Sequence, residues 1–84
     1  MDYKEISEKL EELGYATQFH NLLNSLTVGI PENDNFRLDS IFRIEKSEDK
    51  MSINYFMAQI PVEKEFKTIE ELLKFVRQVF PIED

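Results

Sequence analysis

The chain has 84 residues, which is enough for one domain with a single hydrophobic core. Hydrophobic residues make up 42% of it and charged residues 32%, and only two Gly and three Pro occur, so the composition excludes a disordered or low-complexity segment. Seventeen acidic and ten basic residues give a formal charge of −7, which repels phosphate backbones and anionic lipid. We therefore expect no direct binding of nucleic acid.

Cysteine is absent, which removes disulfide bonds, thiolate metal ligands and cysteine nucleophiles. No apolar run approaches the roughly 20 residues that a membrane span needs, and residues 1–5 do not resemble the start of a signal peptide. No repeat and no linker divides the chain. We expect a cytoplasmic protein with one α+β domain over residues 1–84 and no contact with a membrane.

The first expected element is a helix over residues 2–13. Asp2 and Glu5 have the spacing of a capping box, and Gly14 follows where glycine commonly ends a helix. Residues 15–25 fit two patterns, an amphipathic helix or an irregular strand that turns at its end, and we favour the strand.

Two further strands follow. Apolar residues alternate over residues 26–30 until Pro31 ends the run, and residues 32–35 form a polar turn. Residues 36–45 then alternate as a half-buried strand. The expected core face of this strand carries Phe36, Leu38, Ser40, Phe42 and Ile44, and the other face carries Arg37, Asp39, Ile41, Arg43 and Glu45.

Residues 46–50 are charged and predict a hairpin loop, after which residues 51–62 form one long strand. Both faces of that strand carry apolar residues, so either a bulge switches the faces or the strand is covered on both sides. The last element is a helix over residues 68–80, with a capping box at Thr68 and Glu71 and with Pro81 after its end.

The predicted fold is a two-layer α+β sandwich: a helix, a three- or four-stranded antiparallel sheet and a second helix, with both helices on one sheet face. The other face of the sheet is then uncovered. Aromatic, Met and Arg residues favour the centres of protein interfaces. On this basis the predicted protein-binding residues are Arg37, Ile41, Arg43, Tyr55 and Met57.

No motif for catalysis is present. His20 is the only histidine, so no two-histidine zinc site can form, and we expect His20 to be a partly exposed histidine of a loop or strand. Gly14 and Gly29 are isolated and make no phosphate loop, and no serine has the setting of a hydrolase nucleophile. Residues 32–36 lack the ligand spacing of a calcium loop. We expect no enzyme, no cofactor and no metal.

The order of the expected elements, with the 26–31 strand and with Phe36, Phe42 and Ile44 ahead of Met57-Ala58, resembles the first half of YbjN-type and type III secretion chaperone-like domains. The likeness covers residues 2–80 as a pattern. It implies a small, acidic, non-enzymatic and commonly dimeric protein that binds or stabilises other proteins. The chain lacks room for the further strands that such chaperones carry before their last helix.

Two functional hypotheses follow. The first is a non-enzymatic interaction module, chaperone-like or an adaptor, that binds a partner protein or a second copy of itself through the uncovered sheet face. The second is a small acidic inhibitor, of the kind that phages encode, which mimics nucleic acid and blocks a basic nucleic-acid-binding target. The acidic residues behind the second hypothesis are Glu5, Glu8, Glu11, Glu12, Glu32, Asp34, Glu48, Asp49, Glu63, Glu65, Glu83 and Asp84.

Overall fold

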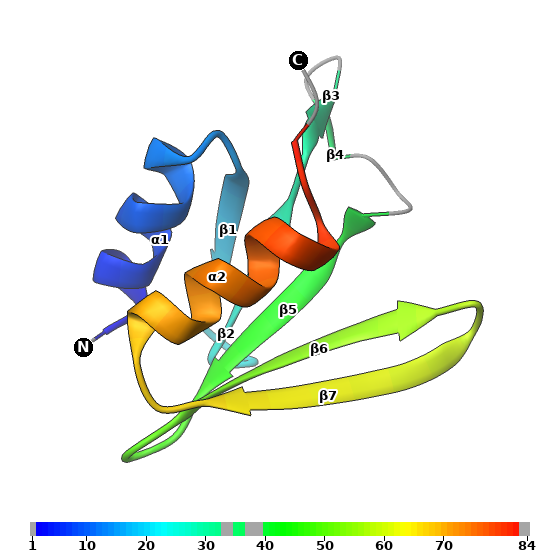
Figure 1. Cartoon of the computed structure of the whole chain (residues 1–84). Coiled ribbons are helices and arrows are strands. Elements are labelled where there is room, and N and C mark those ends of the chain that lie inside the picture. Colours follow the sequence, from blue (N-terminus) through cyan, green and yellow to red (C-terminus); the bar gives the residue numbers. More distant parts are fainter. Residues whose placement is uncertain (1, 33–34, 37–39, 83–84) are drawn as a thin grey trace.

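A computed structural model describes residues 2–32, 35–36 and 40–82. Within these ranges the chain forms a helix, a series of strands and a second helix (Figure 1). The elements are α1 (Tyr3–Glu12), β1 (Ala16–His20), β2 (Ser25–Gly29), β3 (Pro31–Glu32), β4 (Asn35–Phe36), β5 (Phe42–Lys46), β6 (Met51–Met57), β7 (Ile60–Phe66) and α2 (Ile69–Val79).

The main sheet is antiparallel and has five strands in the order β1-β2-β5-β6-β7. The expected sheet of three or four strands is therefore wrong. The error lies in residues 51–62, which form not one strand but most of a hairpin: β6 ends at Met57, the chain reverses at Ala58-Gln59, and β7 continues to Phe66. This reversal also explains the apolar residues on both faces, since they belong to two strands rather than one.

The turn between β6 and β7 carries no sequence signal. Ala58 and Gln59 have φ angles of 51° and 70°, and positive φ at both central residues is the mark of a type I′ turn, for which Asn-Gly is the usual pair. Pro61 follows within β7. A proline is tolerated there because β7 is an edge strand, with β6 as its one strand neighbour in the part of the chain that the structure describes.

Both predicted helix starts are confirmed. The Asp2 carboxylate accepts a hydrogen bond from the Glu5 amide at 2.9 Å, and the Thr68 hydroxyl accepts one from the Glu71 amide at 3.2 Å. Gly14, just beyond α1, has a φ of 104°, which glycine adopts without strain.

The favoured strand reading of residues 15–25 is confirmed for residues 16–20, which form β1 before a turn over residues 21–24. The expected strand over residues 36–45 is shorter, because β5 begins at Phe42, and residues 37–39 lie outside the described ranges. Phe36 pairs instead with Pro31 in the small β3–β4 sheet. Its ring lies 2.6 Å from where a Cβ of residue 29 would stand. Residue 29 is on the face of β2 opposite to the buried Val28, so Phe36 is not on the core face beside Phe42.

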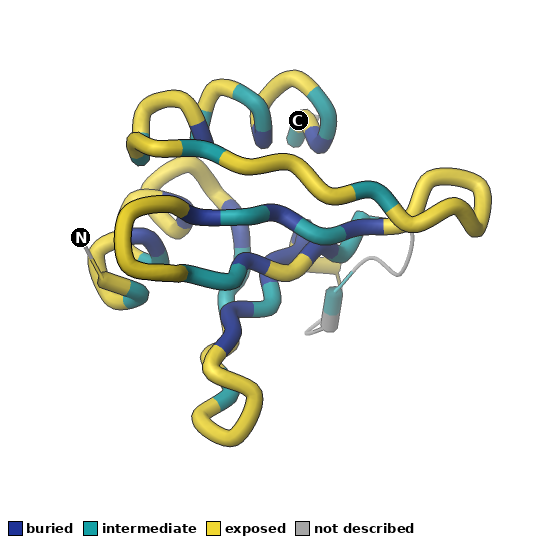
Figure 2. Tube along the Cα trace, turned by 90° about the horizontal axis from the view of Figure 1, so that it is seen from below, coloured by how far each residue is buried: buried dark blue, intermediate teal, exposed yellow. Residues whose placement is uncertain are grey.

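One face of the main sheet forms the core together with both helices. Leu26, Ile44 and Ile53 lie opposite one another on β2, β5 and β6, so their side chains share this face. Figure 2 shows buried residues alternating with less buried ones along these strands, while the β6–β7 turn is exposed. The buried apolar residues are Ile6, Leu10, Tyr15, Leu26, Val28, Ile30, Phe42, Ile44, Met51, Ile53, Tyr55, Leu72, Val76 and Phe80.

A chain of aromatic rings runs through this core beneath α2. The rings of Phe42 and Phe80 stack with centroids 4.6 Å apart, and Tyr55 meets Phe80 edge-on at 5.2 Å. Tyr15 lies on the other side of Phe42, at 6.5 Å, and its hydroxyl donates a buried 2.5 Å hydrogen bond to the Phe80 carbonyl. This bond ties the start of β1 to the end of α2, 65 residues away.

We expect the double substitution Ala58→Asn and Gln59→Gly to stabilise the protein by about 1 kcal/mol, because these residues adopt positive φ with little strain. Urea denaturation measures the change. Asn24 provides the reverse control: it already has a φ of 48°, so Asn24→Ala should lower the free energy of unfolding. An unchanged or lower stability of the Asn-Gly variant would contradict the turn geometry.

Tyr15→Phe should lower the free energy of unfolding by about 1–2 kcal/mol near neutral pH, because the Phe80 carbonyl loses its donor. Burial raises the pKa of Tyr15 above its ordinary value of 10.0, and the charge of Arg77 opposes this rise. The raised pKa means that the folded protein holds the Tyr15 proton more tightly than the unfolded chain. The stabilisation from this tyrosine is therefore complete below pH 10 and is lost as the pH rises through the folded pKa.

Urea denaturation of both proteins between pH 7 and pH 12 provides the measurement. The gap in stability between wild type and Tyr15→Phe should narrow above about pH 10, the ordinary pKa of tyrosine. A constant gap across that range would show that the Tyr15 hydroxyl keeps its proton no more tightly in the folded state.

Candidate functional site

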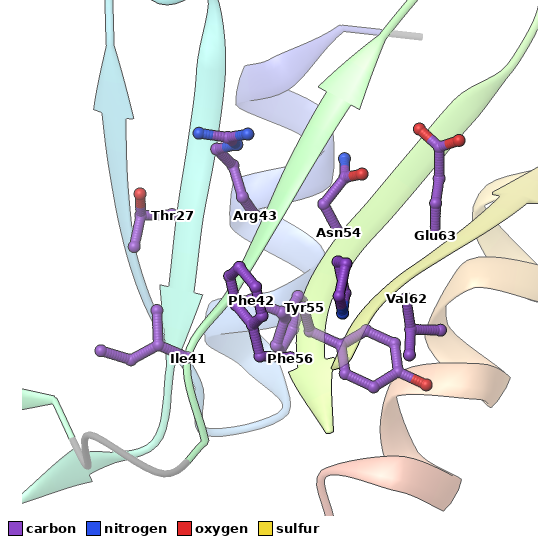
Figure 3. Close-up of a pocket in the computed structure, with 10 residues that line it drawn as sticks. Thr27, Ile41, Phe42, Arg43, Asn54, Tyr55, Phe56, Val62 and Glu63 are labelled. Carbon is purple, nitrogen blue, oxygen red and sulfur yellow. The ribbon is translucent and has the colours of Figure 1, made fainter. Parts of the chain in front are cut away.

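The uncovered face of the sheet carries a polar row across four strands. Thr27 of β2 pairs with Arg43 of β5, Arg43 with Asn54 of β6, and Asn54 with Glu63 of β7. Residues directly opposite in an antiparallel sheet share a face. Figure 3 shows Arg43, Asn54 and Glu63 rising from their strands in the same direction. The pairing therefore places four polar side chains in a line on the face that the helices leave open.

An apolar row lies next to the polar one, towards the β6–β7 turn. Phe56 pairs with Pro61 across the hairpin, and Ile41 precedes β5 on the same side as Arg43. Between the two rows is a shallow hollow of about 450 Å³ (Figure 3). One side of the hollow is polar and the other is apolar.

The floor of the hollow is made by the residues between the two rows, Phe42, Tyr55 and Val62. The Phe42 and Tyr55 side chains lie in the core, 1% and 7% exposed, and Val62 packs against that core from β7. The aromatic core under α2 therefore supports the hollow from behind, and its shape depends on the position of the sheet rather than on a loop.

Hydrogen bonds hold the polar row in place. Glu45, two residues after Arg43 on β5 and on the same face, accepts a hydrogen bond from the side-chain amide of Asn54 at 3.0 Å and lies 3.6 Å from the Arg43 guanidinium. At the other end, the Thr27 hydroxyl is 3.0 Å from Nε2 of His20. Among the described residues Glu63 has no such partner, so its carboxylate is the acidic group of the row that is available to a ligand.

The predicted binding residues do not all come together. Ile41 and Arg43 lie on the uncovered face and line the hollow. Tyr55 is wrong as a surface residue, because its side chain points to the helices and contacts Phe80 and Phe75. Met57 follows the same side of β6 as Tyr55 but stands beyond the core, where it is exposed. Arg37 lies outside the described residues.

Phe56 is the residue that the sequence reasoning missed. It is 75% exposed and lies between the two core-facing positions Tyr55 and Met57. The mixed pattern of residues 51–62 assigned Phe56 to one side of a single long strand, with no way to tell which side the helices cover. The alternation within residues 51–57 places Phe56 on the opposite side from Met51, Ile53 and Tyr55, but only the burial of those three residues in the structure shows that Phe56 is on the exposed side.

The remaining candidates lie elsewhere. His20 is a half-buried strand residue bonded to Thr27, as expected. Leu22 and Leu23, in the turn between β1 and β2, are strongly exposed at a different part of the molecule from the hollow. Within the described ranges, no group of three or more His, Asp or Glu residues could hold a metal ion. No helix in the same ranges is long and apolar enough to cross a membrane.

Comparison with protein-family models, with curated proteins and with solved structures found no match. The resemblance to YbjN-type and type III secretion chaperone-like domains therefore stays a prediction.

Two neighbouring residues test the orientation of β6. Tyr55→Ala should cost about 3 kcal/mol or more, because it leaves a cavity among the aromatic rings. Phe56→Ala should change the free energy of unfolding by no more than about 0.5 kcal/mol, because the ring is largely in water. Urea denaturation of both variants is the measurement. Similar losses in the two variants would show that β6 is turned differently from the arrangement described above.

Proposed function

We propose that this protein is a non-enzymatic binding module that holds another protein against the uncovered face of its sheet, with Phe56 as the anchor. The observation that carries the proposal is the 75% exposure of Phe56 on a paired strand, beside Ile41 and Pro61 at the rim of the hollow. Aromatic residues of this kind supply much of the binding energy of protein interfaces, because a large ring leaves water at little cost in side-chain entropy.

The polar row supports the same function. An interface centre that is apolar and bordered by polar groups is the usual arrangement of a specific contact. Arg43 and Asn54 are both held by Glu45, so they are oriented before any partner arrives. This preorganisation reduces the entropy lost on binding. The partner is a second protein or another copy of this chain, and the proposed site needs no cofactor and no metal.

The test compares Phe56→Asp with Leu22→Asp. Both substitutions replace an exposed apolar residue by aspartate, but only Phe56 lines the hollow. Sedimentation across concentration measures self-association. For binding to other proteins, the wild type and the variants are immobilised and exposed to an extract of the source cells. Each protein that they capture is then purified, and its affinity for the wild type and for the variants is measured. We expect Phe56→Asp to weaken association by at least about tenfold, equal to 1.4 kcal/mol, and Leu22→Asp to leave it unchanged.

Circular dichroism and urea denaturation establish that both variants remain folded. Association that survives in folded Phe56→Asp would overturn the proposal. If the surviving partner were a basic nucleic-acid-binding protein and its affinity fell steeply with salt, the acidic-inhibitor hypothesis would replace the proposal. The exposed carboxylates of α1, Glu5, Glu8 and Glu12, are the observation behind that alternative.

A further inference from the structure

The outer edge of β7 offers backbone groups that no described strand pairs. β7 is the last strand of the sheet, with β6 as its one strand neighbour among the described residues. The two residues that flank a two-residue turn form a hydrogen-bonded pair, and such pairs then alternate along the hairpin. Here the flanking pair is Met57 and Ile60. Counting from this pair, the amides of Val62 and Lys64 point towards β6. Glu63 and Glu65 therefore direct theirs outwards.

On the helix side, the core is incompletely covered at this edge. Val62 and Phe66 of β7 share the face of the buried residues Tyr55 and Met51, with which they pair, yet both remain partly exposed. Phe66 contacts the ring of Phe75 from α2 at 5.2 Å, and Phe75 is itself only half-buried. One further strand beside β7 would cover these apolar side chains.

On the uncovered side, the same edge is acidic. Glu63 and Glu65 alternate with Val62 and Lys64, so their side chains lie on the face opposite to the core. Glu65 forms an ion pair with Lys50, whereas Glu63 has no ion-pair partner among the described residues. A strand added beside β7 would therefore meet apolar side chains on one face and, on the other, the Glu63 carboxylate next to the Lys50–Glu65 ion pair, a group with a net negative charge.

We propose that the edge of β7 binds an extended peptide segment of a partner protein in which basic and apolar residues alternate. The peptide backbone bonds to the outward amides and carbonyls of Glu63 and Glu65, as in other cases of strand addition. Its basic residues lie next to the two glutamates, and its apolar residues pack beside Val62 and Phe66. Lys64 lies between Val62 and Phe66 on the helix side and is exposed. The peptide residue next to Lys64 therefore does not need to be apolar.

A second copy of this chain is a poor occupant of the same edge. Two β7 strands can pair antiparallel only in registers that keep like faces together. In a register centred on Glu63, the Glu63 side chains of the two copies lie opposite each other. In a register centred on Lys64, the two Lys64 side chains lie opposite each other, and Glu63 of each copy lies opposite Glu65 of the other. Like charges directly opposite one another destabilise a sheet. Pro61 also lacks the amide that a longer pairing would use.

The probe for the test is a short synthetic peptide in which lysine and valine alternate, added to the 84-residue chain. Amide hydrogen exchange measured by nuclear magnetic resonance reports the edge residue by residue. We expect exchange at Glu63 and Glu65 to slow by about tenfold or more at saturating peptide. The amides of Val62 and Lys64, already bonded to β6, should change little and serve as an internal control.

Charge variants separate local recognition from general attraction. Glu63→Lys should weaken binding by about tenfold. The matched control, Glu8→Lys on α1, makes the same change in net charge away from the edge and should leave the affinity unchanged. A peptide of alternating glutamate and valine should not bind.

Three results would overturn the proposal: no binding of the lysine–valine peptide, binding without slower exchange at Glu63 and Glu65, or equal loss of affinity in Glu8→Lys and Glu63→Lys. The two proposed sites share Glu63, which also lines the hollow, but Phe56 makes no part of the β7 edge. Phe56→Ala should therefore keep its affinity for the peptide, so that the failure of either proposal can be told from the failure of the other.

Discussion

The chain of aromatic rings beneath α2 is the contact on which the rest of the structure depends. Phe42 of β5 stacks on Phe80, Tyr55 of β6 meets Phe80 edge-on, and Tyr15, directly before β1, donates a hydrogen bond to the Phe80 carbonyl. The residue at the end of α2 is therefore fixed by contacts from three parts of the sheet. All four rings belong to the buried core, and aromatic side chains bury more surface per residue than most others. The sheet is thereby covered on one face, and the position of the covered face decides which side chains remain at the surface.

The proposed binding surfaces both follow from this one-sided coverage. On the uncovered face, Phe56 and Ile41 have no helix above them and adjoin a row of polar residues that Glu45 orients. At the β7 edge, Val62 and Phe66 pack against the core but remain partly exposed. The two helices lie on one side of the five strands, and apolar side chains remain exposed at these two places.

Local patterns of the sequence were sufficient where neighbouring residues decide the structure. The cap residues Asp2 and Thr68 bond to amides three positions away, and the alternation over residues 26–30 appears unchanged in β2. The reversal at Ala58-Gln59 could not be found in this way, because neither residue favours positive φ. Pairing of β6 with β7 over seven residue pairs holds the turn in place despite the local preference.

By itself the sequence determined the two helices with their ends, the alternating strand that begins at Leu26, the acidic composition and the absence of cysteine chemistry, since each of these depends on residue type or short spacing. Only the tertiary structure decided that Tyr55 is buried and Phe56 exposed. An alternating strand with apolar residues on both sides has two equivalent orientations until another element covers one of them. The packing of Phe75 and Phe80 on Tyr55 makes that choice, and with it decides which side chains form the proposed binding surface.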